Sequence, residues 1–177
     1  MIVFCAFEQI QTVTEYGKKY GFNNSFPLFF CKNYSAQVLK ANMRIVGATE
    51  FAVVLYRDKL PKFNNGRQTD PETGKPIRGT GHMIFDWFTW ERDGKDIPKI
   101  HPTQKPIKVL QRLIEIFTDE GDVVIDPCCG SASTLRAARD IGRSAYGFEI
   151  DKNFYARAKS EMLVPSAQIE MGDILND

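Results

Sequence analysis

Val123-Val-Ile-Asp-Pro-Cys-Cys-Gly-Ser-Ala-Ser-Thr134 is the stretch of the sequence that decides the fold. It opens with three β-branched residues, which are typical of a short strand buried inside a sheet. A loop of small residues follows, and apolar residues at helical spacing begin at once with Leu135, Ala138 and Ile141. A strand that leads through a short loop into a helix is the unit from which parallel α/β sheets are built.

Segments on both sides of this stretch continue the alternation of strands and helices. Pro106 suits the first turn of a helix, and Asp151 suits the N-cap of another. Residues 8–20 also have apolar residues at helical spacing, with Gly21 as the stop. Apolar runs typical of buried strands occupy residues 2–7, 26–31, 51–56, 145–148 and 168–171. We therefore predict one α/β domain over residues 1–177, with a mostly parallel sheet and helices on both faces.

Composition excludes several classes of protein. The chain has 177 residues, of which 43% are hydrophobic and 25% charged, and its formal net charge is +1, so a polyanion partner is not indicated by overall charge. It contains no run of 18 apolar residues, and its first ten residues lack the basic region of a signal peptide. The four cysteines form no C-x-x-C pair and only two histidines occur. We expect no metal site, and reduced thiols in the cytoplasm.

The loop after Ile125 predicts a ligand site. Asp126 stands at the carboxyl end of a strand, where open α/β sheets bind ligands, and the following helix offers free N–H groups at its start. Small residues allow a ligand to approach the backbone closely. The loop is neither G-x-G-x-x-G nor a phosphate loop. A nucleotide-like cofactor and a tight turn without any ligand both remain open from this loop alone.

Two further segments favour the cofactor. Glu149 ends the next strand, about twenty residues after Asp126, where acidic residues commonly hold ribose hydroxyls. His101-Pro-Thr-Gln-Lys-Pro106 brings a lysine to the start of a helix, where it suits a carboxylate. Taken alone, Glu149 could be an exposed strand end, and the hexapeptide could be an ordinary loop that opens a helix.

Three motifs resemble the ordered signature of the N4-cytosine/N6-adenine DNA methyltransferases. In chain order they are His101–Pro106, Asp126–Thr134 and Gly147-Phe-Glu-Ile-Asp151. The carboxylate-binding motif precedes the loop motif, which is similar to the β group of that family. Residues 2–7, 29–33 and 51–56 are similar to further segments of the same group. The resemblance implies a Rossmann-like methyltransferase fold and S-adenosylmethionine as cofactor.

The resemblance also implies roles for single residues. Thr103 and Lys105 would contact the methionine carboxylate, Glu149 would hold the ribose hydroxyls, and Ile150 would lie against the adenine. The methionine and ribose would be lined by Asp126, Gly130, Ser131 and Ser133, and the floor of the pocket by Phe4, Cys5 and Phe7. Cys128 stands where the family usually has Phe, so it would form a smaller wall. Ala132 stands where the family usually has Gly, which is tolerable if its φ stays negative.

The family's catalytic motif, Asp/Asn/Ser-Pro-Pro-Tyr/Phe, is absent, because the sequence contains no Pro-Pro pair. We therefore assign no catalytic residue. In the family this motif lies on a strand just before the segment that starts here at Met1, and the chain opens on a strand of the buried type. We expect the first strand or strands of the fold to be missing and the enzyme to be truncated or split. The motif would then be encoded upstream or supplied by a second chain.

The composition of residues 57–99 predicts that they form an inserted target-recognition segment. They are rich in Gly, Pro, Asn and charged residues, and residues 57–79 hold more basic than acidic side chains. Contacts to double-stranded DNA would come from Lys59, Lys62, Arg67, Lys75 and Arg78. The aromatic residues Phe85, Trp87, Phe88 and Trp90 suit either base stacking or, more commonly, the core.

The leading hypothesis is a site-specific DNA methyltransferase, or part of one, that acts on an exocyclic amine, with adenine N6 favoured. A restriction–modification or phage setting follows from the same resemblance. Two alternatives remain: a catalytically inactive module that binds cofactor or DNA, and a methyltransferase that acts on RNA or protein.

Overall fold

The computed structural model describes residues 1–35 and 37–164, so the strand expected at residues 168–171 lies outside the described residues. Its larger sheet has four strands in the order β1-β3-β2-β4, where β1 is Ile2–Cys5, β3 Thr49–Tyr56, β2 Asn24–Lys32 and β4 Trp87–Trp90. β3 pairs antiparallel with both β1 and β2, and β2 pairs parallel with β4. Three of the four strands therefore run in one direction, with β3 reversed between them.

A second sheet contains β5 (Val123–Asp126) and β6 (Ser144–Gly147), which pair in parallel from Val123↔Ser144 to Asp126↔Gly147. No described strand joins this sheet to the larger one. The predicted α/β fold with parallel strands is confirmed, but two of the four strand pairings are antiparallel and the described residues form two separate sheets. The edges of β1 and β5 that face away from their partners are therefore open among residues 1–35 and 37–164.

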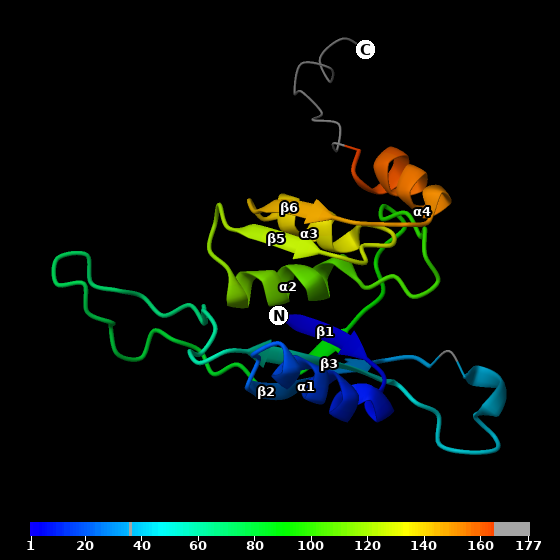
Figure 1. Ribbon diagram of the computed structural model, residues 1–177, viewed down its shortest axis with the longest axis horizontal. Coiled ribbons are helices and arrows are strands. Elements are labelled where there is room, and N and C mark those ends of the chain that lie inside the picture. The colour runs from blue at the N-terminus through cyan, green and yellow to red at the C-terminus, as the bar shows by residue number, and fades with distance from the viewer. Residues whose placement is uncertain (36, 165–177) are drawn as a thin grey trace, which may run out of the picture.

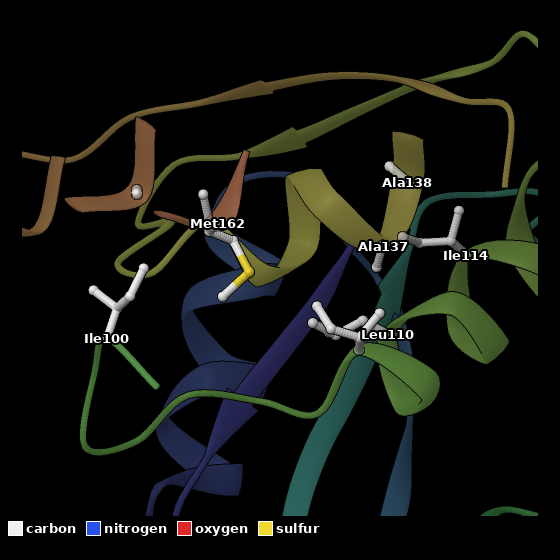
Figure 2. Close-up of a cluster of buried hydrophobic side chains, with 9 residues drawn as sticks. Ile100, Leu110, Ile114, Ala137, Ala138 and Met162 are labelled. Atoms are coloured by element: carbon white, nitrogen blue, oxygen red, sulfur yellow. The ribbon is translucent and has the colours of Figure 1, made fainter. Parts of the chain in front are cut away.

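Helices bind the two sheets together. α2 (Ile107–Phe117) packs Val109 and Leu113 against the larger sheet, while its Leu110 and Ile114 pack against α3 (Ser133–Asp140). Figure 2 shows Leu110 and Ile114 facing α3, in a buried cluster that also contains Ile100, Ala137, Ala138 and Met162. α3 in turn packs on β5 and β6. The apolar helix α2 therefore buries two of its own faces, one against each sheet's side of the core, and thereby holds the two sheets together.

The remaining helices complete the layers. α1 (Ile10–Lys19) follows a 3-10 turn over Phe7–Gln9 and covers the far face of the larger sheet, where Gly17 lies against Leu55. α4 (Lys152–Arg157) continues into a π-helical turn over Ala158–Met162. The described residues include no helix with the length and apolar character needed to cross a bilayer.

Several local expectations can be compared with the fold. Asp151 does cap α4, since its Oδ1 accepts the N–H groups of Asn153 at 2.8 Å and Phe154 at 3.0 Å. β4 was not predicted as a strand, because its four residues show no alternation and become a strand only by pairing with β2. The start of α2 is capped by Asp93, whose Oδ1 accepts the N–H of Ile107 at 2.8 Å.

The strands end at two opposite edges. In Figure 1 the arrowheads of β1, β5 and β6 point to the same side, which we call the carboxyl edge. The β2–β3 loop, described over residues 33–35 and 37–48, projects beyond this edge. The opposite, amino edge carries a long projection over residues 64–82, which we call the arm. These two projections lie at opposite ends of the molecule.

Candidate functional site

The loop between β5 and α3 wraps around a left-handed turn. Gly130 has φ 50° and Ala132 φ 61°, and the N–H of Ala132 donates to Cys129 O at 2.7 Å. A negative φ, the condition under which Ala would be tolerable at this position, is therefore not met. The loop turns too tightly for it, and the buried methyl group is held in the conformation that glycine adopts without strain.

The two predicted carboxylates both organise this loop. Asp126 Oδ1 accepts the N–H of Cys128 at 3.0 Å. Glu149 Oε2 accepts the N–H of Gly130 at 2.8 Å, and its Oε1 accepts the N–H of Asp151 at 2.8 Å. Glu149 thus ties the end of β6 to the middle of the loop after β5. Each carboxylate offers about four lone-pair positions, so both have room for a ligand donor.

The other predicted loop residues differ in their exposure. Ser131 and Ser133 are buried, and their hydroxyl groups bond to each other at 2.8 Å. Their side chains therefore belong to the interior of the loop rather than to its exposed surface. Cys128 is exposed, and Ile150 is 98% exposed, so both are free to form walls against a ligand.

The segment around His101 lies against the same loop. The His101 ring packs on Phe154 with 4.6 Å between centroids, and its Nδ1 accepts the N–H of Thr103 at 3.2 Å. A side chain placed at Gly130 would meet the His101 ring at 3.8 Å. Gln104 holds the segment in place by accepting the N–H of Ile100 at 3.1 Å. The first two motifs, separate in sequence, are therefore neighbours at the carboxyl edge.

Lys105 lies in a pocket of aromatic rings and charge. Its Nζ is 5.2 Å from the Phe4 ring centroid, 5.5 Å from that of Trp90 and 3.8 Å from Glu50 Oε2. Glu50 also forms an ion pair with Lys32. Burial lowers the pKa of Lys105, as does the nearby Lys32, while Glu50 opposes that shift. One carboxylate is thus shared by two lysines, which leaves positive charge available for an anionic ligand.

Sequence reasoning missed this cluster. Lys32 ends β2, Glu50 lies at the start of β3 and Trp90 ends β4, so the three meet only because these strands pair. The available signal was that each charged residue stands at the end of an apolar run. Among the predicted floor residues, Phe4 belongs to the cluster and packs on Phe30 at 5.1 Å between centroids.

Cys5 and Phe7 are placed differently from Phe4. Cys5 is half-buried, and burial raises the pKa of its thiol. Phe7 is 64% exposed and packs on Phe51 at 5.6 Å between centroids, on the face of the sheet that α1 covers. The structure therefore does not bring Phe7 together with Lys105.

The five predicted DNA-binding residues are not at the carboxyl edge. Lys62 forms ion pairs with Asp119 at 2.7 Å and Asp122 at 2.9 Å, just before β5 begins, which places it at the amino edge. Asn64 fixes the base of the arm there, since its N–H donates to Ile116 O at 2.7 Å. The other four predicted residues are exposed, in the arm or in the segment leading to it: Lys59, Arg67, Lys75 and Arg78.

The predicted aromatic cluster divides in two. Trp90 is buried in the core, and Phe88 packs against it. Phe85 and Trp87 are both more than half exposed and stack on each other with 6.2 Å between ring centroids. The prediction that these aromatic residues belong to the core is thus confirmed for Phe88 and Trp90, and not for Phe85 and Trp87.

Comparison with known proteins gives consistent results. The family model described as DNA methylase matches residues 1–160. The chain is 27% identical to YubD of Escherichia coli (strain K12) over 177 residues, which is 100% of this chain and 67% of YubD. It is 39% identical to the type II methyltransferase M2.DpnII of Streptococcus pneumoniae over 105 residues, which is 59% of this chain and 34% of that enzyme. The chain thus spans only part of each relative.

Solved structures show the same fold. The M1.HpyAVI–SAM complex superposes with a TM-score of 0.67 and 26% identity, covering 90% of this chain and 72% of that one. The cytosine-N4-specific PvuII DNA methyltransferase superposes with a TM-score of 0.60 and 16% identity, covering 84% of this chain and 53% of that one. At that identity the second likeness concerns the fold alone.

Proposed function

Because the chain belongs to the DNA methylase family, we propose that it binds S-adenosylmethionine at the carboxyl edge and serves transfer of the methyl group to an exocyclic amine of DNA. The observation that carries the proposal is the meeting of three motifs at one edge. Glu149 bonds to Gly130, and Gly130 lies against His101, four residues before Lys105. Motifs distant in sequence are thereby assembled around one potential ligand position.

The residues present fit the parts of this cofactor. Lys105 is a half-buried cation that Glu50 neutralises only in part, which suits the methionine carboxylate. Asp126 suits the ammonium group, and Glu149 suits the ribose hydroxyls. Ile150 offers an exposed apolar surface for the adenine. The cofactor supplies the electrophilic methyl group, and these residues bind and orient it.

The proposal includes a second polypeptide segment that carries the catalytic motif. An exocyclic amine reacts only when its lone pair is freed from the ring and the base is held in place, which that motif does in the family. Two observations support an added segment. One edge of β1 and one edge of β5 have no partner strand among residues 1–35 and 37–164. The uncovered face of β5 and β6 is apolar, with four residues each more than half exposed: Val123, Ile125, Tyr146 and Phe148.

Target recognition by residues 57–99 and a preference for adenine N6 remain parts of the proposal. The exposed basic residues of the arm support the first. A cytoplasmic location also belongs to it, because the substrate is DNA and the four cysteines are free thiols. A cofactor-binding module without activity of its own is the second candidate, favoured by the absence of a Pro-Pro pair.

Two measurements on the 177-residue chain test the proposal. Calorimetric titration with S-adenosylmethionine should give saturable binding, and absence of binding would contradict it. Transfer of a labelled methyl group to unmodified genomic DNA should be barely detectable with this chain alone. Robust transfer by the chain alone would show that no second segment is needed.

A further inference from the structure

The tip of the β2–β3 loop, residues 37–45, belongs to the projection at the carboxyl edge, which is the edge that also holds the candidate cofactor site (Figure 1). The loop is closed at its base, where the N–H of Lys32 donates to Ala48 O at 2.8 Å and the Ser35 hydroxyl donates to Gly47 O at 2.8 Å. Its base residue Lys32 pairs with Glu50, which in turn contacts Lys105. The loop therefore emerges directly from the cluster that surrounds Lys105.

The tip has internal turns. The N–H of Lys40 donates to Gln37 O at 2.9 Å, and the N–H groups of Met43 and Arg44 donate to Lys40 O at 2.9 and 3.1 Å. The Gln37 side chain accepts a bond from Arg44 at 3.1 Å. These bonds present the side chains of the tip from a turned backbone rather than from an extended one.

The composition of the tip is unusual for a projection into water. Leu39 is 96% exposed, Met43 82% and Ile45 98%, although leaving a large apolar side chain in water costs about 1.5–3 kcal/mol relative to burying it. Between Asn33 and Thr49 the sequence holds two basic residues, Lys40 and Arg44, and no acidic residue. A surface that combines cations with exposed apolar side chains suits a partner that is both anionic and rich in apolar flat groups.

Duplex DNA has both properties. Basic side chains bind its phosphates, and apolar side chains such as Leu, Ile and Met insert between base steps as wedges. An enzyme that acts on a base must take that base out of the stack, so a wedge at the edge that holds the reaction site has a purpose. The arm is at the other edge, separated from the site by the length of β5, about 13 Å at about 3.3 Å per residue.

We propose that residues 37–45 form a DNA-contacting surface at the carboxyl edge. Lys40 and Arg44 bind phosphates there, and Leu39, Met43 and Ile45 pack against the bases next to the opened step. This inference rests on the proposed function, because it names the surface through which DNA reaches the cofactor site. It adds to the arm a second contact, which lies at the same edge as the site.

Fluorescence anisotropy with a labelled duplex, measured at several salt concentrations, tests the charged part. Lys40→Ala/Arg44→Ala should weaken binding about tenfold and reduce the slope of log K against log salt by about 2. The matched control Lys18→Ala/Lys19→Ala, which removes the same charge at the end of α1, should stay within about twofold of the unaltered chain. Equal behaviour of the two variants would overturn the inference.

Leu39→Ala/Ile45→Ala tests the apolar part. It should weaken binding about threefold or more with an unchanged salt slope, because no phosphate contact is lost. Unaltered affinity would overturn the wedge role. Both variants change exposed residues, so thermal unfolding followed by circular dichroism should match that of the unaltered chain.

The outcomes separate this inference from the proposed function. If the unaltered chain binds neither S-adenosylmethionine nor DNA, both are wrong. If it binds both and the tip variants behave like the control, only the role of the tip is wrong. If the tip instead binds a protein, both tip variants should bind DNA as tightly as the unaltered chain does.

Discussion

At the scale of single residues, Lys105 is the side chain whose charge matters most for the proposed cofactor binding. The cation lies between two aromatic rings and shares Glu50 with Lys32. Lys105→Met keeps the length and packing of the side chain but removes its charge. If Lys105 binds the cofactor carboxylate, affinity for S-adenosylmethionine should fall about tenfold to a hundredfold, the range of a lost charge-assisted bond. Calorimetry measures it, and Lys99→Met, an exposed change in the same segment, should have little effect.

The same residue predicts a pH dependence. Burial lowers the pKa of Lys105, so the lysine loses its charge earlier than an exposed lysine as the pH rises. Cofactor affinity should therefore decrease as the pH is raised from neutral, and should do so less steeply in Lys105→Met. Because both proteins are titrated with the same ligand, the comparison removes the contribution of the ligand's own titration. Parallel pH profiles would contradict the role.

Ala132 offers a test of strain in the cofactor loop. Its left-handed conformation costs about 1–2 kcal/mol for a residue with a Cβ, while its buried methyl group contributes about 0.8 kcal/mol. Ala132→Gly should therefore leave the free energy of unfolding within about 1 kcal/mol of the unaltered chain, since added backbone entropy offsets relief of strain. Ala132→Val should lower it by about 3 kcal/mol, through strain and overpacking together. Urea denaturation of both variants measures the difference.

At the scale of elements, α2 is the connection between the two sheets. Leu110 is 5% exposed and packs against α3, while Val109, the preceding residue, packs against the larger sheet. Leu110→Ala should lower the free energy of unfolding by about 3 kcal/mol, because it leaves a cavity in the shared core. Lys108→Ala, on the exposed side of the same helix, should change it by no more than about 0.5 kcal/mol. A small effect at Leu110 would mean that the two sheets are held together in another way.

At the scale of the whole molecule, two projections at opposite edges are each proposed to contact DNA. Arg67→Ala/Arg78→Ala removes two exposed cations of the arm. If the arm contacts phosphates, affinity should fall for duplexes of any sequence and the salt slope should decrease by about 2. Glu72→Gln, on the same arm, should bind DNA as well as the unaltered chain or slightly better. An unchanged slope in the arm variant would leave the carboxyl edge as the DNA-binding side.

Much of the site could be predicted from local sequence. Asp126, Gly130 and Glu149 belong to segments whose strand, turn and helix are determined by neighbouring residues, and the bond between Glu149 and Gly130 agrees with their predicted proximity. Neither the positive φ of Ala132 nor the burial of Ser131 and Ser133 could be predicted, because both follow from how tightly the loop closes onto α3. The cluster of Lys32, Glu50 and Lys105 requires pairing between distant strands.

The sequence by itself determined the α/β class, the family resemblance and the three motifs, because each rests on short-range patterns of apolar, small and charged residues. It also determined that the Pro-Pro motif is absent. Only the tertiary structure decided which segments share an edge. Strand direction sends the β2–β3 loop to the cofactor side and the arm to the other, and no local pattern encodes that choice. Only the pairing of the strands showed the open edges of β1 and β5, since pairing is a property of segments far apart in the chain.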